Sequence, residues 1–179
     1  MEELHFELLK WLVEHNTESP PARNTDPLQD EIQAYLENLG FEVARKQMYD
    51  NDSIVVGVLK GTNPDAPKLI LNGHVDVANV EDPKHWTYPP FELTKSGDYV
   101  YGRGVSDMKG GVASLFYVLE QLKAKGISPK GDIIVQSVVG EEVGEAGTKY
   151  ACEMSPKADL AIVLDTCLLY TSPSPRDRQ

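Results

Sequence analysis

A nearly unbroken run of apolar and β-branched residues, GDIIVQSVVG at 131–140, constrains the fold of this 179-residue chain more than any other stretch. A run of this length and composition is typical of a β-strand that is buried on both faces. Such strands belong to sheets that helices cover on each side. We therefore expect a layered α/β fold with 131–140 as a strand of its sheet.

The rest of the chain alternates between helical and extended patterns. Apolar spacing and turn residues predict helices over 4–13, 27–39, 107–125 and 147–154, and strands over 41–49, 53–61, 68–73 and 158–165. A long irregular region at 73–104 has room for one short hairpin, and such regions in compact domains are usually functional. Strand and helix alternate in the second half, which predicts a sheet with parallel strands.

Composition narrows the partners and the compartment. The formal net charge of −11 argues against nucleic acid and against an anionic membrane surface. Cys152 and Cys167 make no disulfide framework, which favours a reducing compartment. The N-terminal stretch lacks the basic region of a signal peptide, and no apolar run approaches the ~20 residues of a membrane span. We therefore expect a cytoplasmic protein.

Two groups of histidine and acidic residues that could bind a ligand follow a predicted strand or a glycine-rich turn. The ligand sites of open α/β sheets lie at such places. The first, LNGHVDV, contains His74 and Asp76. Residues two apart in an extended segment point the same way, so Asp76 is placed to hold or tune His74. The second, YGRGVSDMKGG, puts Asp107 at the start of a long predicted helix, where the helix dipole favours a carboxylate.

The remaining acidic residues lie at the ends of the last two predicted strands. VVGEEVGEAGT places Glu141 beside Glu142 after the most apolar strand, and Asp165 ends the final one. Paired carboxylates at a buried strand end are costly unless cations neutralise them. Carboxylates and one imidazole at one sheet edge suit a divalent metal, and enough carboxylates make a two-metal site.

Each feature alone has an ordinary structural explanation. His74 could be a hydrogen-bonded loop residue, the two glutamates a solvated pair, and Asp165 a helix cap. The glycines around Asp107 could serve a turn, since they lack the Lys-Ser/Thr of a phosphate-binding loop and the spacing of a dinucleotide-binding turn. Their joint occurrence at strand ends in one α/β frame favours the metal site.

Four motifs in this order, GHVDV, W..PPF, YGRGVSDMKGG and GEEVGEAGT, resemble the M20 family of metal-dependent peptidases and deacylases. This is the group of acetylornithine deacetylase and succinyl-diaminopimelate desuccinylase. The resemblance covers nearly everything from Leu4 to Thr166. It implies that 1–166 is the N-terminal part of a three-layer α/β metallopeptidase catalytic domain with a mixed, mostly parallel sheet. The family's lid domain, through which it forms homodimers, would lie downstream and is absent here.

The resemblance also implies a ligand set for two divalent ions, zinc or cobalt. His74 would bind one metal together with Asp165, Asp107 would bridge both metals, and Glu142 would bind the second. The family's remaining ligand is a late histidine beyond this chain. The other histidines present are too early in the sequence for that role: His5, His15 and His85.

The same resemblance assigns Glu141 as the general base and gives Asp76 the task of orienting His74. The expected reaction is amide hydrolysis, in which Glu141 takes a proton from a metal-activated water and passes it to the leaving nitrogen. DVANVEDPKHW and QSVVGEEVGEAGT are most similar to the branch of N-formyl-4-amino-5-aminomethyl-2-methylpyrimidine deformylases. We therefore expect a hydrolase of linear amide C–N bonds whose substrate is a small N-acyl amine.

Two other functions stay open. One is a dipeptidase or aminopeptidase of the same family, and the other is a non-catalytic metal-binding module. The presence of Glu141 argues against the second, because a pure metal binder has no need of a general base beside its ligand.

The closing stretch CLLYTSPSPRDRQ, at 167–179, continues neither the strand pattern nor the helix pattern. Its part from Cys167 to Asp177 matches one reading frame of a transposase-type sequencing-library adapter. We expect 167–179 to be a non-native tail, and we expect the chain by itself to be inactive.

Overall fold

A computed structural model describes residues 2–165, and the tail expected at 167–179 lies outside them. The helices are α1 (Glu3–Val13), α2 (Asp26–Asn38), α3 (Gly110–Ala124) and α4 (Gly147–Met154). The strands are β1 (Glu42–Tyr49), β2 (Asp52–Leu59), β3 (Leu69–His74), β4 (Thr94–Ser96), β5 (Tyr99–Tyr101), β6 (Ile133–Val138) and β7 (Leu160–Val163). Short helical turns lie at Pro83–His85, Val105–Lys109 and Glu141–Val143.

The main sheet has the strand order β1-β2-β6-β3-β7. β2 is antiparallel to both of its neighbours, whereas β3 is parallel to β6 and to β7. Four of these five strands therefore run in one direction, which confirms the expected mixed, mostly parallel sheet. Because β3 and β6 pair in register from Leu69↔Ile133 to His74↔Val138, their carboxyl ends meet at one edge.

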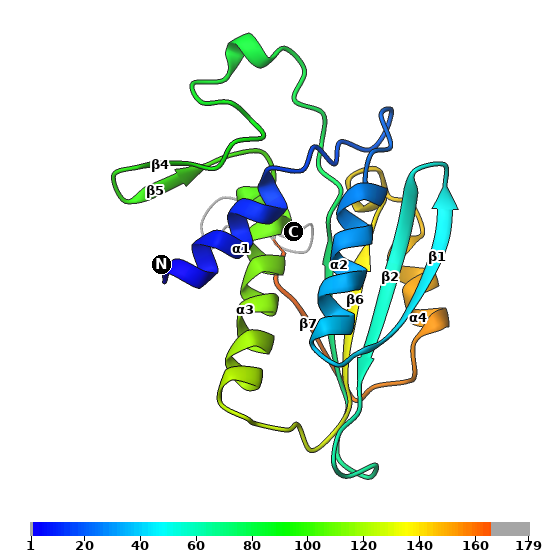
Figure 1. The fold of residues 1–179 in the computed structure, drawn as a ribbon. Coiled ribbons are helices and arrows are strands. Elements are labelled where there is room, and N and C mark those ends of the chain that lie inside the picture. The colour runs from blue at the N-terminus through cyan, green and yellow to red at the C-terminus, as the bar shows by residue number, and fades with distance from the viewer. Residues whose placement is uncertain (1, 166–179) are drawn as a thin grey trace, which may run out of the picture.

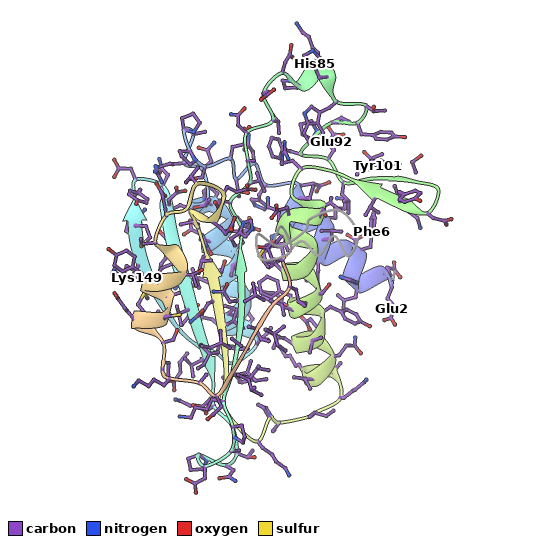
Figure 2. All side chains as sticks on the ribbon, turned by 180° about the vertical axis from the view of Figure 1, so that it is seen from behind. Glu2, Phe6, His85, Glu92, Tyr101 and Lys149 are labelled. Atoms are coloured by element: carbon purple, nitrogen blue, oxygen red, sulfur yellow. The ribbon has the colours of Figure 1, made fainter. Side chains whose placement is uncertain are left out.

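Helices cover both faces of this sheet (Figure 1). α1, α2 and α3 lie on one face, and α4 lies on the other, which is turned to the viewer in Figure 2. All six residues of β6 are buried, as the run at 131–140 predicted. The described residues thus form the three layers that the resemblance implies.

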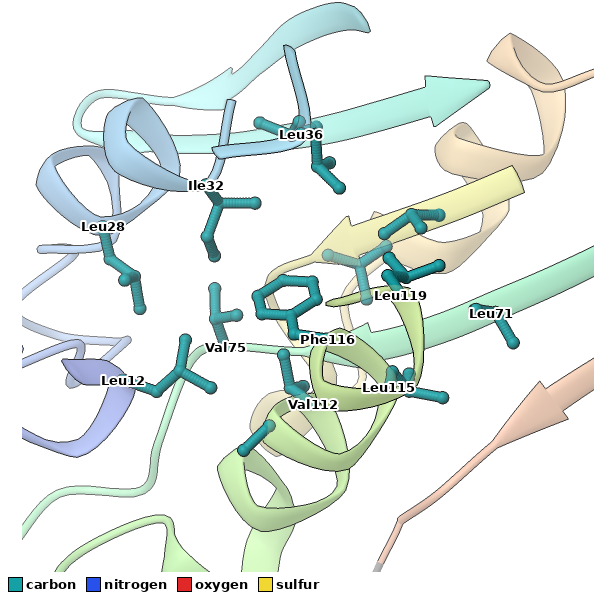
Figure 3. Close-up of a cluster of buried hydrophobic side chains, with 14 of the residues drawn as sticks. Leu12, Leu28, Ile32, Leu36, Leu71, Val75, Val112, Leu115, Phe116 and Leu119 are labelled. Carbon is teal, nitrogen blue, oxygen red and sulfur yellow. The ribbon is translucent and has the colours of Figure 1, made fainter. Parts of the chain in front are cut away.

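Phe116 of α3 is a central member of the apolar core between the helices and the sheet (Figure 3). Its side chain is 1% exposed. Its ring lies 5.0 Å from the ring of Tyr35 and 6.0 Å from that of Trp11, measured between centroids. One aromatic residue thus joins α1, α2 and α3, and burial of such a side chain stabilises a fold by ~1.5–3 kcal/mol.

The start of the long helix differs from the prediction. α3 begins at Gly110, because Asp107 has φ −126° and ψ 100°, which is not a helical conformation. The amide of Lys109 instead donates to the carbonyl oxygen of Gly104, 2.8 Å away, and closes a wide turn before the helix. Asp107 therefore lies in that turn, and the helix dipole is not what holds its carboxylate.

The irregular region at 73–104 contains the expected hairpin, formed by β4 and β5. It projects beyond the layered body as an arm that carries His85 and Tyr101 (Figure 2). Within residues 2–165, no helix combines the length and apolar character needed to cross a lipid bilayer.

Candidate metal centre

His74 is the last residue of β3, and only 1% of its side chain is exposed. Its Nδ1 lies 2.9 Å from the backbone carbonyl oxygen of Asp76 and 3.5 Å from Asp76 Oδ1. Because a carbonyl oxygen can only accept a hydrogen bond, Nδ1 carries the proton in the neutral ring. Nε2 is therefore the nitrogen whose lone pair can bind a metal.

Three carboxylates surround that nitrogen. Nε2 lies 3.1 Å from Asp107 Oδ1, 3.8 Å from Glu141 Oε2 and 3.8 Å from Asp165 Oδ2. These residues come from the turn before α3, the turn after β6 and the segment that follows β7. The parallel strands bring them together, because β3, β6 and β7 all end at this edge.

Glu142 is held more firmly than its neighbour Glu141. Its Oε1 accepts a hydrogen bond from the amide of Ala78 at 3.0 Å, and its own amide donates to Asp76 Oδ2 at 3.3 Å. The turn is flanked by Gly140 and Gly144, which have φ of 84° and 71°, a region that favours glycine. The adjacent carboxylates therefore differ in their surroundings, as different chemical roles would require.

The charges of the site favour a cation. Burial lowers the pKa of His74, but the close contacts with Asp76 and its negative charge outweigh burial and raise this pKa to about 9. Burial raises the pKa of Glu142, and the charge of Asp107 raises it further, against the hydrogen bond from Ala78. Asp76 is fully buried, and its Oδ1 has no hydrogen-bond partner among the described residues.

The donor set fits a divalent metal ion. Two groups bring one ligand atom per residue within 4.8 Å of one another, namely His74–Asp107–Glu142 and His74–Glu141–Asp165. Imidazole nitrogen with carboxylate oxygens is a set that zinc and similar ions accept. A cation at Nε2 would also be stabilised by the buried charge of Asp76 on the other side of the ring.

All the predicted site residues thus lie at one edge of the sheet. His74 belongs to both groups of donors, so the geometry does not divide the ligands between two metals, and the division implied by the resemblance stays a prediction. The other histidines lie elsewhere. His5 contacts Ser114 Oγ at 3.1 Å, His15 contacts the carbonyl oxygen of Trp11 at 2.9 Å, and His85 lies on the projecting arm.

Sequence reasoning missed Lys109, which lies two residues after Asp107 and is completely buried. Its Nζ donates to the backbone carbonyl oxygen of His15 at 2.9 Å. Burial lowers the pKa of this lysine to about 7, although the charge of Asp76 acts in the opposite direction. The sequence around Lys109 does not indicate that it is buried, because its burial depends on a distant segment, the one that contains His15.

Comparison with known proteins identifies the family of this chain. The model of a family described as Peptidase family M20/M25/M40 matches residues 70–174, more than half of the chain. The N-formyl-4-amino-5-aminomethyl-2-methylpyrimidine deformylase of Halalkalibacterium halodurans is 52% identical over 160 residues, which are 89% of this chain and 38% of that protein. The deformylase of the same name from Bacillus subtilis is 46% identical over 162 residues, with 90% and 38% covered.

A solved structure agrees with these matches. An M20 family metallo-carboxypeptidase from Sulfolobus solfataricus has the same fold, with a TM-score of 0.76 at 22% identity over 92% of this chain and 37% of that one. The chain spans 38% of the length of the two curated relatives above. The resemblance seen in the four motifs is confirmed, and the chain belongs to peptidase family M20/M25/M40.

Proposed function

We propose that this chain forms part of the catalytic domain of a metal-dependent hydrolase that cleaves the amide bond of a small N-acyl amine. One observation carries the proposal. His74 presents Nε2 to three carboxylates, while its Nδ1 is tied to Asp76. That arrangement is a metal ligand with its orienting partner, set among further oxygen ligands.

Two curated relatives support the proposed substrate class. Both are named as deformylases of an N-formylated aminomethylpyrimidine, and they share 52% and 46% of their residues with this chain over the matched part. We infer that the whole protein removes a formyl or similarly small acyl group from an amine on a small molecule. The reaction breaks the C–N bond and releases a carboxylic acid and the free amine.

The metal-holding residues would be His74, Asp107, Glu142 and Asp165. We infer two divalent ions, zinc or cobalt, which when bound would lower the pKa of a water and polarise the substrate carbonyl. The imidazole must be neutral to bind metal, and Asp76 helps by fixing its proton on Nδ1. Glu142 supplies a carboxylate whose position is set by the amide of Ala78.

Glu141 would be the general base. Its carboxylate faces His74 across 3.8 Å, yet its side chain is 52% exposed, so it can reach a solvent water and a substrate. It would accept the proton of the attacking water and deliver it to the leaving nitrogen. The side chain of Glu142 is engaged by the amide of Ala78, which makes it the less suitable of the two for proton transfer.

The whole protein is proposed to act in the cytoplasm as a homodimer formed through parts that this chain lacks. We further propose that 167–179 is not native sequence; the family match reaches residue 174, so its last eight residues fall within this tail. We also propose that the chain by itself has no activity, because it lacks the late histidine ligand that the family resemblance implies.

Turnover by the full-length protein tests this function. We expect chelator-sensitive hydrolysis of N-formyl and N-acetyl amines, and little hydrolysis of free dipeptides. Dipeptide hydrolysis at comparable kcat/KM would instead favour a peptidase. Metal binding without turnover of either substrate class would favour a non-catalytic module.

A further inference from the structure

The loop at 14–25, before α2, contacts the segment that carries Asp76. The amide of Val77 donates to the carbonyl oxygen of Thr17 at 3.1 Å, and the amide of Ser19 donates to that of Val77 at 3.3 Å. The hydroxyl of Thr17 donates to the carbonyl oxygen of Val75 at 2.6 Å. The loop therefore forms an isolated parallel β-bridge, Glu18↔Val77, and its hydrogen bonds reach the backbone on both sides of Asp76.

Farther along this loop, Arg23 links two acidic residues that are distant in sequence. Nη1 donates to Asp52 Oδ2 at 2.9 Å. Nη2 donates to Glu145 Oε1 at 2.7 Å, and Nη1 also reaches Glu145 Oε2 at 3.2 Å. This is a bidentate arginine–carboxylate pair, which only the planar guanidinium can form. The guanidinium also lies 3.9 Å from the ring centroid of Tyr49.

Asp52 gives Arg23 a fixed anchor. Its side chain is fully buried at the start of β2 and accepts hydrogen bonds from Ser19 Oγ at 2.6 Å and Thr25 Oγ1 at 2.8 Å. Arg23 itself has φ of 34°, which a non-glycine residue rarely adopts. Local backbone strain of this kind persists where the surrounding contacts hold it in place.

Glu145 connects Arg23 to the turn that carries Glu141 and Glu142. Its amide donates to the carbonyl oxygen of Gly140 at 2.7 Å and closes the turn. A Cβ placed on Gly140 would lie 2.6 Å from Glu145 Cβ, so the two residues are in direct backbone-to-side-chain contact. Moving Glu145 therefore moves the turn between Gly140 and Glu145, and with it Glu141 and Glu142.

We propose that Arg23 is a positioning residue that fixes the Glu141–Glu142 turn against β2 through its paired contacts with Glu145 and Asp52. The roles of Glu141 and Glu142 rest on the proposed function, whereas the mechanical link rests on the contacts themselves. Loss of the guanidinium would leave two carboxylates without their shared partner. The turn would shift, and Glu142 would leave the position that the amide of Ala78 now gives it.

Arg45 provides a matched control on the same protein. Like Arg23, it contacts two carboxylates and has a side chain that is 24% exposed, but its partners are Asp26, at 2.9 Å, and Asp30. These contacts join β1 to α2 and include none of the residues proposed to bind metal. Arg45→Met therefore reports the general cost of losing such an arginine.

The experiment compares Arg23→Met, Arg23→Lys and Arg45→Met in the full-length protein. The readouts are the melting temperature, Co²⁺ and Zn²⁺ affinity by competition with a chromophoric chelator, the visible spectrum of bound Co²⁺, and kcat and KM. We expect Arg23→Met to weaken metal binding about 10–100-fold, to alter the Co²⁺ spectrum and to lower kcat more than it raises KM. Arg23→Lys should fall between Arg23→Met and the wild type.

Arg45→Met should lower the melting temperature without changing metal affinity or the spectrum. If Arg23→Met fails to fold, Glu145→Gln keeps the side-chain size and should reproduce the loss of metal affinity. Equal metal affinity in the folded Arg23 or Glu145 variant and in Arg45→Met would overturn the proposal. If Arg23→Met loses metal affinity but the wild-type protein cleaves no N-acyl amine, the positioning role is supported and the proposed function is refuted.

Discussion

His74 Nε2 and Asp107 Oδ1 lie 3.1 Å apart, although 33 positions separate the two residues in the sequence. His74 is held by the end of β3, and Asp107 by the turn that precedes α3. Their approach creates a buried imidazole beside an exposed carboxylate, and that pair is the nucleus around which the other acidic side chains gather.

The pKa of His74 predicts how the stability of the metal-free protein changes with pH. Its folded-state pKa of about 9 lies above its ordinary value of 6.5, so the protonated ring stabilises the fold. This contribution is complete below pH 6.5 and is lost as the pH rises through 9. It amounts to on the order of 3 kcal/mol. We expect the free energy of unfolding of wild type minus that of His74→Gln to shrink by this amount between pH 6 and pH 10.

Lys109 also changes the stability with pH, so wild type has to be compared with His74→Gln and not measured alone. Burial lowers the pKa of Lys109 to about 7, so its unfavourable contribution is relieved as the pH rises from 7 toward 10.5. This trend opposes that of His74 and is present in both proteins, so the difference between them cancels it. A difference that stays constant or widens with pH, measured by urea denaturation in excess chelator, would contradict the assignment.

Gly140→Ala should reduce turnover because it displaces the turn that carries Glu141 and Glu142, the first of which is the proposed general base. Gly140 has φ of 84°, and its new Cβ would lie 2.6 Å from Glu145 Cβ. We expect kcat to fall at least about tenfold, because small displacements of catalytic groups are costly. The matched control is Gly126→Ala, where φ is 62° and no atom lies within 4 Å of the new Cβ. Both variants lose about 1–2 kcal/mol of stability from the left-handed backbone, but only Gly140→Ala should lose activity.

Phe116→Ala should be strongly destabilising because it leaves a cavity where α1, α2 and α3 meet. We expect a loss of about 3–5 kcal/mol in the free energy of unfolding, measured by urea denaturation of the chain. Val118 lies on the same helix but is 51% exposed, so Val118→Ala should change this free energy by no more than about 0.5 kcal/mol. Similar losses in the two variants would mean that the core is not centred on Phe116.

Periodicity and strand-end chemistry carried the prediction of the fold and of the residues that gather at the metal centre. The buried character of 131–140 follows from local composition, and the presence of parallel strands follows from the alternation of strand and helix. The start of α3 does not, because a bond between Lys109 and Gly104 replaces the first helical turn. The residues of β7 are apolar, yet all four are exposed, because β7 is an edge strand of the described sheet.

The contact between Arg23 and Glu145 could not be predicted for a similar reason. It spans 122 positions and joins two side chains whose local sequences show no periodicity that links them. Only the path of the loop past β2 brings them together. The residues proposed as metal ligands were thus predictable from their places at strand ends, whereas the residues that hold them in position required the three-dimensional arrangement.

Glu141→Gln and Glu142→Gln form the most direct test of the central claim, since the two changes are chemically identical and adjacent. The measurement is metal content by mass spectrometry together with kcat for an N-formyl amine, in the full-length protein. We expect Glu141→Gln to keep its full metal content and to lose at least about 10²–10⁴-fold in kcat, because it cannot accept a proton. Glu142→Gln should lose bound metal. Loss of metal from Glu141→Gln, or near-normal turnover by it, would contradict the account.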